Sequence, residues 1–230
     1  MAGTLPDLDV WVDYGDPILN MVLHRAETHA LFWLTLFSAP LAWRGSGLRA
    51  NAWGLVLSMA YLGWSVLAQQ QVTAIARATI QAQGIAADRV LVTPSAFNTV
   101  LWRVVVVGGG AYHEGFYSFF DDSTRIDFRN GERGEALLAE VQHVDGIQRI
   151  RRFSKGLYAL RDDEGMVRIS DLRMGQHPSF TFAFHAAQRQ GASAATALVP
   201  SRAAGRRPDA AVGLPWLWRR MWGERISSPG

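Results

Sequence analysis

The sequence contains no cysteine, which excludes disulfides, thiolate zinc sites and a cysteine nucleophile. Any bound metal would therefore need histidine, aspartate or glutamate ligands. Lysine is also nearly absent, since Lys155 is the only one, and arginine supplies the remaining positive charge. The formal net charge is only +3. Basicity of this size is weak evidence for nucleic-acid binding, so no nucleic-acid partner is expected.

Charged residues of either sign are scarce, and they are distributed unevenly along the chain. Charged residues make up 19% of the sequence, whereas soluble domains average about 25%. Two apolar segments, 30–43 and 51–68, stand out, and no formal charge occurs between positions 50 and 76. Residues 51–68 are long enough to span a bilayer, whereas 30–43 is short and reaches that length only when counted back to Ile18. Length and the absence of charge favour two membrane helices, with the lipid bilayer as partner, over a buried helix of a soluble protein. The basic turn at 44–49 would then be cytoplasmic.

The pattern changes at Asp88, where segments rich in β-branched residues begin. Glycines 108–110 predict a turn between two strands, and Asp163-Glu164-Gly165 predicts a second hairpin. Before Asp88, residues 69–85 are expected to form a more polar amphipathic helix that stops at Gly84. After it, one helix is expected within 131–144. The expected fold class is α+β: an N-terminal membrane helical hairpin, then a small antiparallel-sheet domain with one helix.

Three regions follow from these changes in composition. Residues 1–87 would hold the metal motif and the membrane helices, and residues 88–190 the α+β domain. Residues 191–230 would form a flexible, basic tail rich in tryptophan, disordered up to about position 212. The segment LPWLWRRMWGERI at its end is predicted either to lie in a membrane interface or to pack on the domain, with the interface favoured.

The first chemical candidate is a metal site near the N-terminus. Asp7, Asp9, His24 and His29 offer the oxygen and nitrogen ligands that zinc or manganese accepts. The two histidines are five positions apart, which on a regular helix separates them by about 140°, so they would not share one face. The alternative is that the aspartates cap a helix or turn and the histidines are interfacial polar residues.

Two further groups of polar residues carry weaker signals. In the first, His113 and Glu114 are adjacent, so a strand would point them to opposite faces, and ordinary hairpin surface is favoured. This group consists of Tyr112, His113, Glu114, Tyr117 and Asp121. The second group is basic, and a solvated strand face is favoured over a phosphate site. It consists of Arg149, Arg151, Arg152 and Lys155. His143, His177 and His185 look isolated.

Several motifs in order resemble one family. These segments are similar to those of bacterial membrane-bound, metal-dependent hydrolases of the YdjM-like, inner-membrane-associated type: GTLPDLDVWVDYGD, HRAETHALFW, RANAWGLVLSMAYLGWSVLAQ, VLVTPSAFNTVLWRVVV, GFYSFFD, FSKGLYALRDDEG and ISDLRMG. The family's Pro-Asp-x-Asp motif maps to Pro6, Asp7 and Asp9. Its His-Arg-x-x-x-His motif maps to His24, Arg25 and His29. The family pattern has a further helix before the first motif and more helices after position 43, so the resemblance implies a copy truncated at the N-terminus and shortened internally.

The resemblance implies a hydrolase in the bacterial inner membrane. Its divalent metal, zinc or manganese, would activate a water molecule. Glu27 is the candidate general base, and Arg25 could neutralise an anionic group of the substrate. The expected substrate is a small, lipid-like or amphiphilic molecule. The alternative is a catalytically incomplete, membrane-anchored scaffold or binding protein, as the missing helices favour.

Overall fold

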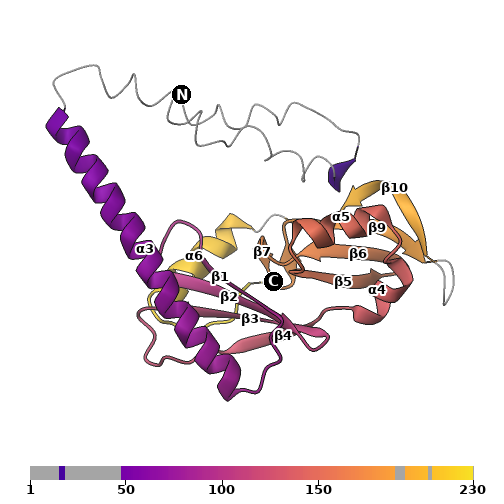
Figure 1. Ribbon diagram of the computed structural model, residues 1–230, viewed down its shortest axis with the longest axis horizontal. Helices are drawn as coiled ribbons and strands as arrows, with labels where there is room; N and C mark the ends of the chain where they lie inside the picture. Colours follow the sequence, from indigo (N-terminus) through magenta and orange to yellow (C-terminus); the bar gives the residue numbers. More distant parts are fainter. Residues whose placement is uncertain (1–15, 19–47, 190–194, 207–208, 230) are drawn as a thin grey trace. The chain divides into compact units, whose positions relative to one another are not determined.

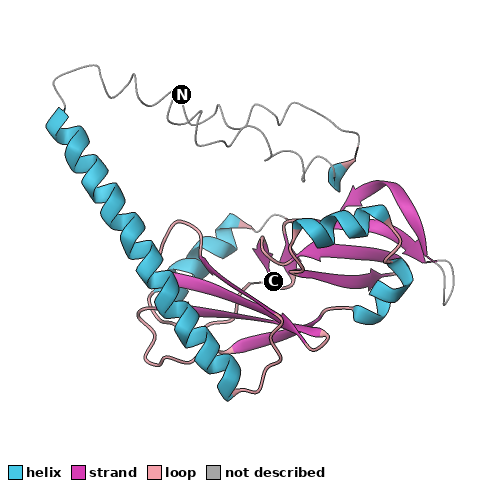
Figure 2. Ribbon diagram, viewed as in Figure 1, coloured by secondary structure: helices cyan, strands magenta, loops and turns pink. Residues whose placement is uncertain are grey.

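The structure is a computed structural model that describes residues 16–18, 48–189, 195–206 and 209–229 (Figure 1). The chain divides into two compact units, Met1–Val66 and Leu67–Gly230. The second unit contains two four-stranded antiparallel sheets and a two-stranded ribbon (Figure 2). Two cavities, one beside Tyr112 and one beside Tyr158, lie within this second unit.

Helix α3 (Leu48–Ala82) is the longest helix described, with 35 residues. Its end is set by Gly84, whose φ of +63° lies in the left-handed region that favours glycine. The N–H of Gly84 donates to the carbonyl of Gln81, and the N–H of Ile85 donates to that of Ile80. These two bonds form a Schellman motif, which confirms the predicted stop at Gly84.

The first sheet has the strand order β1-β2-β3-β4. Its strands are β1 (Arg89–Pro94), β2 (Leu101–Gly108), β3 (Ala111–Ser118) and β4 (Phe128–Glu132). Gly109 and Gly110 have φ values of +58° and +78° and form the tight turn between β2 and β3. This hairpin is therefore where the sequence predicted it.

One face of the first sheet is covered by the C-terminal half of α3. Four small or branched side chains of the helix recur every fourth position and so form one stripe: Ala68, Val72, Ala76 and Ile80. The stripe packs with the alternate residues of β2 that point to this face, Trp102, Val104 and Val106. Every one of these side chains is buried.

The second sheet has the strand order β10-β9-β6-β5. Its strands are β5 (Tyr158–Asp163), β6 (Met166–Asp171), β9 (Ala183–Arg189) and β10 (Ala195–Ala203), and the short ribbon pairs β7 (Gly175–Gln176) with β8 (Ser179–Phe180). Helices α4 (Glu135–Val141) and α5 (Asp145–Phe153) connect the first sheet to β5. Glu164 and Gly165, both at positive φ, make the predicted turn between β5 and β6.

A second core joins the other face of the first sheet to the second sheet. Val105 and Val107 of β2 point to this face together with Tyr112 of β3, because the register sets Val107 opposite Tyr112. They pack against Leu157, Ala159, Leu172 and Phe180. Strands β2 and β3 are thus buried on both sides, which explains the continuous run of valines in the sequence.

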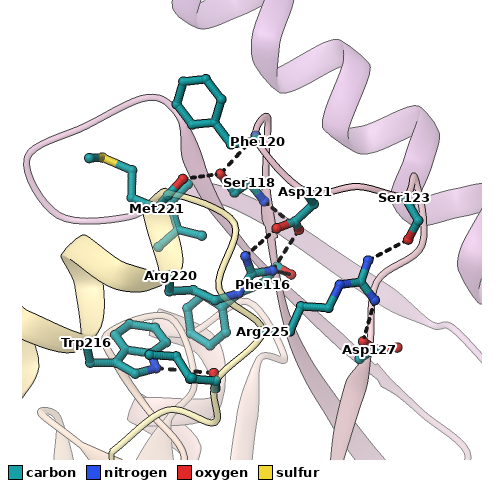
Figure 3. Close-up of polar contacts among 12 residues, drawn as sticks. Phe116, Ser118, Phe120, Asp121, Ser123, Asp127, Trp216, Arg220, Met221 and Arg225 are labelled. Carbon is teal, nitrogen blue, oxygen red and sulfur yellow. Dashed lines mark hydrogen bonds and ion pairs between the residues drawn. The ribbon is translucent and has the colours of Figure 1, made fainter.

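Helix α6 (Ala210–Met221) packs on the first sheet through two side chains (Figure 3). Trp216 is buried, and its ring lies edge-on to that of Phe116 at a centroid distance of 5.0 Å. Arg220 binds Asp121 in a bidentate pair, with N–O distances of 2.5 and 2.7 Å. Its Nη2 also donates to the carbonyl of Phe116 at 2.8 Å. The aromatic C-terminal segment therefore packs on the domain, the alternative that the sequence did not favour.

The expected membrane helical hairpin is wrong for the part of the chain that the structure describes, since none of its helices is both long and apolar enough to cross a bilayer. The apolar segment 51–68 is one half of α3, and the other half carries glutamines and Arg77 and packs on a sheet. The segment 30–43 lies outside the described residues. The expected single helix of the sheet domain, residues 88–190, is also wrong, because α4 and α5 are both present there.

Two local expectations also differ from the structure. The stretch around Arg149 and Arg152, predicted as a strand, is helix α5, whose buried residues Ile147 and Ile150 are three positions apart as a helix requires. In the tail predicted to be flexible, 195–203 forms β10, because its backbone pairs with the edge of β9.

Candidate ligand-binding site

The residues predicted to form a metal site are not tested by the structure. Asp7, Asp9, His24, Arg25, Glu27 and His29 all lie outside the described residues. Within the described ranges, no group of three or more histidine, aspartate or glutamate residues is arranged to hold a metal ion. The metal site therefore stays a prediction from the sequence.

The group of polar residues around His113 and Glu114 does not form ordinary hairpin surface. Tyr112, Glu114 and Tyr117 of β3 are all buried, each no more than 5% exposed. Alternation along the strand sends Tyr112 and Glu114 towards the second sheet, while His113 points to the opposite face and contacts Asn130 at 2.7 Å. The prediction that His113 and Glu114 point apart is thus confirmed.

Glu114 is the centre of a buried polar network. Its Oε1 accepts a hydrogen bond from Nε of Arg103 at 2.5 Å, and its Oε2 accepts one from the backbone N–H of His177 at 2.7 Å. Arg103 in turn donates from Nη1 to the carbonyl of Leu172 at 2.9 Å. The Arg103 and Glu114 side chains are only 7% and 2% exposed. The pair therefore ties the first sheet to the loop between β6 and β8.

Tyr112 and His177 meet at the edge of this network. The Tyr112 hydroxyl lies 2.7 Å from Nδ1 of His177. Burial, aided by the negative charge of Glu114, raises the pKa of Tyr112 to about 12, and burial lowers the pKa of His177 below its ordinary value. Both groups are accordingly uncharged at neutral pH, and the tyrosine can donate to a neutral imidazole.

Gly131 makes room for the Tyr112 ring. A Cβ atom built on Gly131, which pairs with Tyr112 across β3 and β4, would overlap the end of that ring. Any larger residue at this position would displace the Tyr112 hydroxyl from His177. Glycine inside a strand often marks this kind of close approach.

A cavity of about 670 Å³ opens beside Tyr112 and His177. Its apolar wall comes from α4, β5 and the ribbon: Ala136, Leu137, Ala159, Leu160, Pro178 and Phe180. Its polar lining includes Ser170, which is buried, and Arg161 and Arg168 nearer the surface. The volume falls within the range of about 300–1,000 Å³ that is typical of small-molecule sites. An apolar wall facing a few fixed polar groups can hold an amphiphilic molecule in one orientation.

Sequence reasoning missed the partners of Tyr112. His177 looked isolated because it is 65 residues from Tyr112, and only the packing of two sheets brings them together. The one available signal was Glu114, a carboxylate inside a strand with apolar neighbours. A buried acid of this kind needs a cationic or N–H partner, although the sequence does not say which one.

Comparisons of the chain with protein-family models, with curated proteins and with solved structures give no match. The resemblance to membrane-bound hydrolases therefore stays a prediction from sequence motifs, and a function has to be inferred from the geometry of the site.

Proposed function

We propose that the two-sheet unit is a binding module that takes up a small amphiphilic molecule in the cavity beside Tyr112 and His177. One observation supports this above the others: a 670 Å³ cavity places an apolar wall opposite a hydrogen-bonded tyrosine–histidine pair. The proposal corresponds to the binding-protein alternative from the sequence, and it does not depend on a metal.

The electrostatics of the site favour an uncharged polar head group. Tyr112 remains protonated because its pKa is about 12, and the lowered pKa of His177 keeps the imidazole neutral. The pair can therefore donate and accept hydrogen bonds without attracting an ion. Arg168 lies 3.1 Å from Asp163, so its charge is already partnered. A hydroxyl or carbonyl head group with a short alkyl chain suits these surroundings.

Filling the cavity is expected to prevent binding. The probe is 1-decanoylglycerol below its critical micelle concentration, and binding is measured by isothermal titration calorimetry. Ala136→Trp places an indole against the cavity, so the affinity should fall at least about tenfold. The matched control is Ala139→Trp, which alters an exposed alanine of the same helix that does not line the cavity. Absence of saturable binding to the unmodified chain, or equal losses in the two variants, would refute the proposal.

The metal-dependent hydrolase is the second candidate function, and its support is the order of the Asp7, Asp9, His24 and His29 motifs in the sequence. Elemental analysis of the purified chain tests it. Stoichiometric zinc or manganese that is lost in His24→Ala, but retained in the control His143→Ala, is the expected result. Metal-free protein in every sample would eliminate this candidate. His143 is a suitable control because it is exposed and lies in the described unit, away from the motif.

A further inference from the structure

A second cavity, of about 560 Å³, is rich in arginine. Four of its lining residues are Arg89, Arg133, Arg151 and Arg152, and Asp88 is the only acid among them. The lining therefore carries a formal charge of +3. This cavity shares no residue with the one beside Tyr112, so a ligand bound here would be independent of the proposed function.

Two of these arginines contact the same aromatic ring. The guanidinium of Arg133 lies 4.8 Å from the ring centroid of Tyr158, and that of Arg151 lies 5.5 Å from it. Tyr158 is only 3% exposed. Cation–π contact accounts for the attraction of each guanidinium to the ring. It does not neutralise the positive charge of either guanidinium.

The same two side chains have unsatisfied donors. Nε of Arg133 and Nε of Arg151 are buried and have no hydrogen-bond partner among the described residues. Arg133 donates to the carbonyl of Gly156 at 3.3 Å and reaches Glu135, a largely exposed carboxylate, at 3.3 Å. For Arg151, the described residues offer no carboxylate within ion-pair distance. Buried donors without partners call for an explanation, and a bound acceptor is one.

Several arginines elsewhere in this unit are paired with acids. Arg149, on the same helix as Arg151, pairs with Asp145 at 2.6 Å. The two most buried arginines, Arg103 and Arg220, each bind a carboxylate at 2.5 Å. Arg103, Arg149 and Arg220 thus have acidic partners, whereas Arg89, Arg151 and Arg152 lie around one cavity without an ion pair to any described acid. A positive cavity of this kind attracts and concentrates anions.

We propose that this arginine cavity binds a phosphate-type anion, either inorganic pyrophosphate or the phosphate group of a small ester. Guanidinium groups donate in a fork that matches phosphate oxygens, and four arginines line this one cavity. A single-stranded nucleic acid fits less well, because the Tyr158 ring is occupied by Arg133 and Arg151 and cannot stack on a base.

Calorimetric titration of the whole chain with pyrophosphate tests the site. Saturable binding is expected, and it should weaken as sodium chloride rises from about 50 to 200 mM, because salt screens the attraction. Arg151→Gln should lower the affinity about tenfold or more, as the loss of charged hydrogen bonds implies. The matched control is Arg149→Gln, which neutralises the neighbouring arginine that pairs with Asp145 outside the cavity, and it should change the affinity less than about twofold.

A second variant separates loss of binding from loss of folding. Arg89→Gln removes an exposed charge at the start of β1, so the fold should persist while the affinity for pyrophosphate falls. Pyrophosphate should raise the Tm of the unmodified chain and of Arg149→Gln, but not that of Arg151→Gln. Three results would overturn the proposal: no saturable binding of pyrophosphate, equal losses in Arg149→Gln and Arg151→Gln, or tight binding of an oligonucleotide alone.

Discussion

Arg220→Ala is expected to lower the free energy of unfolding by about 3–5 kcal/mol, because it leaves a buried carboxylate without its cation. The Arg220 side chain is 7% exposed and that of Asp121 only 1%. The bidentate pair and the bond to the Phe116 carbonyl are lost together (Figure 3). Urea denaturation followed by tryptophan fluorescence measures the change.

Arg219→Ala is the matched control for this prediction. Arg219 is on the same helix and pairs with Glu224 at 2.7 Å, but the two side chains are 56% and 48% exposed. Pairs as exposed as this one contribute at most about 1 kcal/mol. If the two variants lost similar amounts of stability, the buried pair would not be what holds α6 on the first sheet.

Glu114→Ala is expected to have the second large effect, again about 3–5 kcal/mol. The substitution leaves the buried guanidinium of Arg103 without its carboxylate and removes the acceptor for the N–H of His177. His177 should then lose its fixed position beside Tyr112, so binding of 1-decanoylglycerol should weaken along with stability. Denaturation and calorimetry on the same sample measure the two losses.

A double variant tests the cause of the Glu114 effect. Arg103→Met and Glu114→Leu together remove both charges, so no buried ion is left without a partner. The free energy of unfolding of this double variant should therefore be close to that of the unmodified chain and well above that of Glu114→Ala. The surface control is Glu132→Ala, an exposed acid on the neighbouring strand β4, which should change the stability by less than about 0.5 kcal/mol. Failure of the double variant to recover would mean that packing, and not the buried charge, dominates the loss.

Local signals in the sequence predicted part of this fold correctly. Gly84, the glycines at 108–110 and the turn at Glu164 and Gly165 act through their own backbone conformation, so short stretches suffice to find them. Helix α5 was missed because Ile147 and Ile150 lie among arginines that resemble a polar strand face. Strand β10 was missed because its stability comes from pairing with β9, which a composition rich in alanine and serine does not reveal.

Most contacts in the candidate sites cannot be predicted from the spacing of residues along the sequence. Arg103 and Glu114 are eleven residues apart and pair across a hairpin that the sequence did predict, so the pair was within reach. His177 and Tyr112, in contrast, are joined by the packing of two sheets. The arginine cavity combines Arg89 and Arg133 with the predicted basic stretch at Arg151 and Arg152, and only the fold brings these together.

The Arg220–Asp121 pair can form only late in the synthesis of the chain. The two residues are 99 positions apart, whereas the four strands of the first sheet follow one another directly in the chain. A ribosome adding about 5–20 residues per second needs about 5–20 s to make the intervening stretch. During that interval Asp121 lacks its cation and Phe116 lacks the ring of Trp216. The contacts that bury Asp121 and Phe116 therefore form only after α6 has been made.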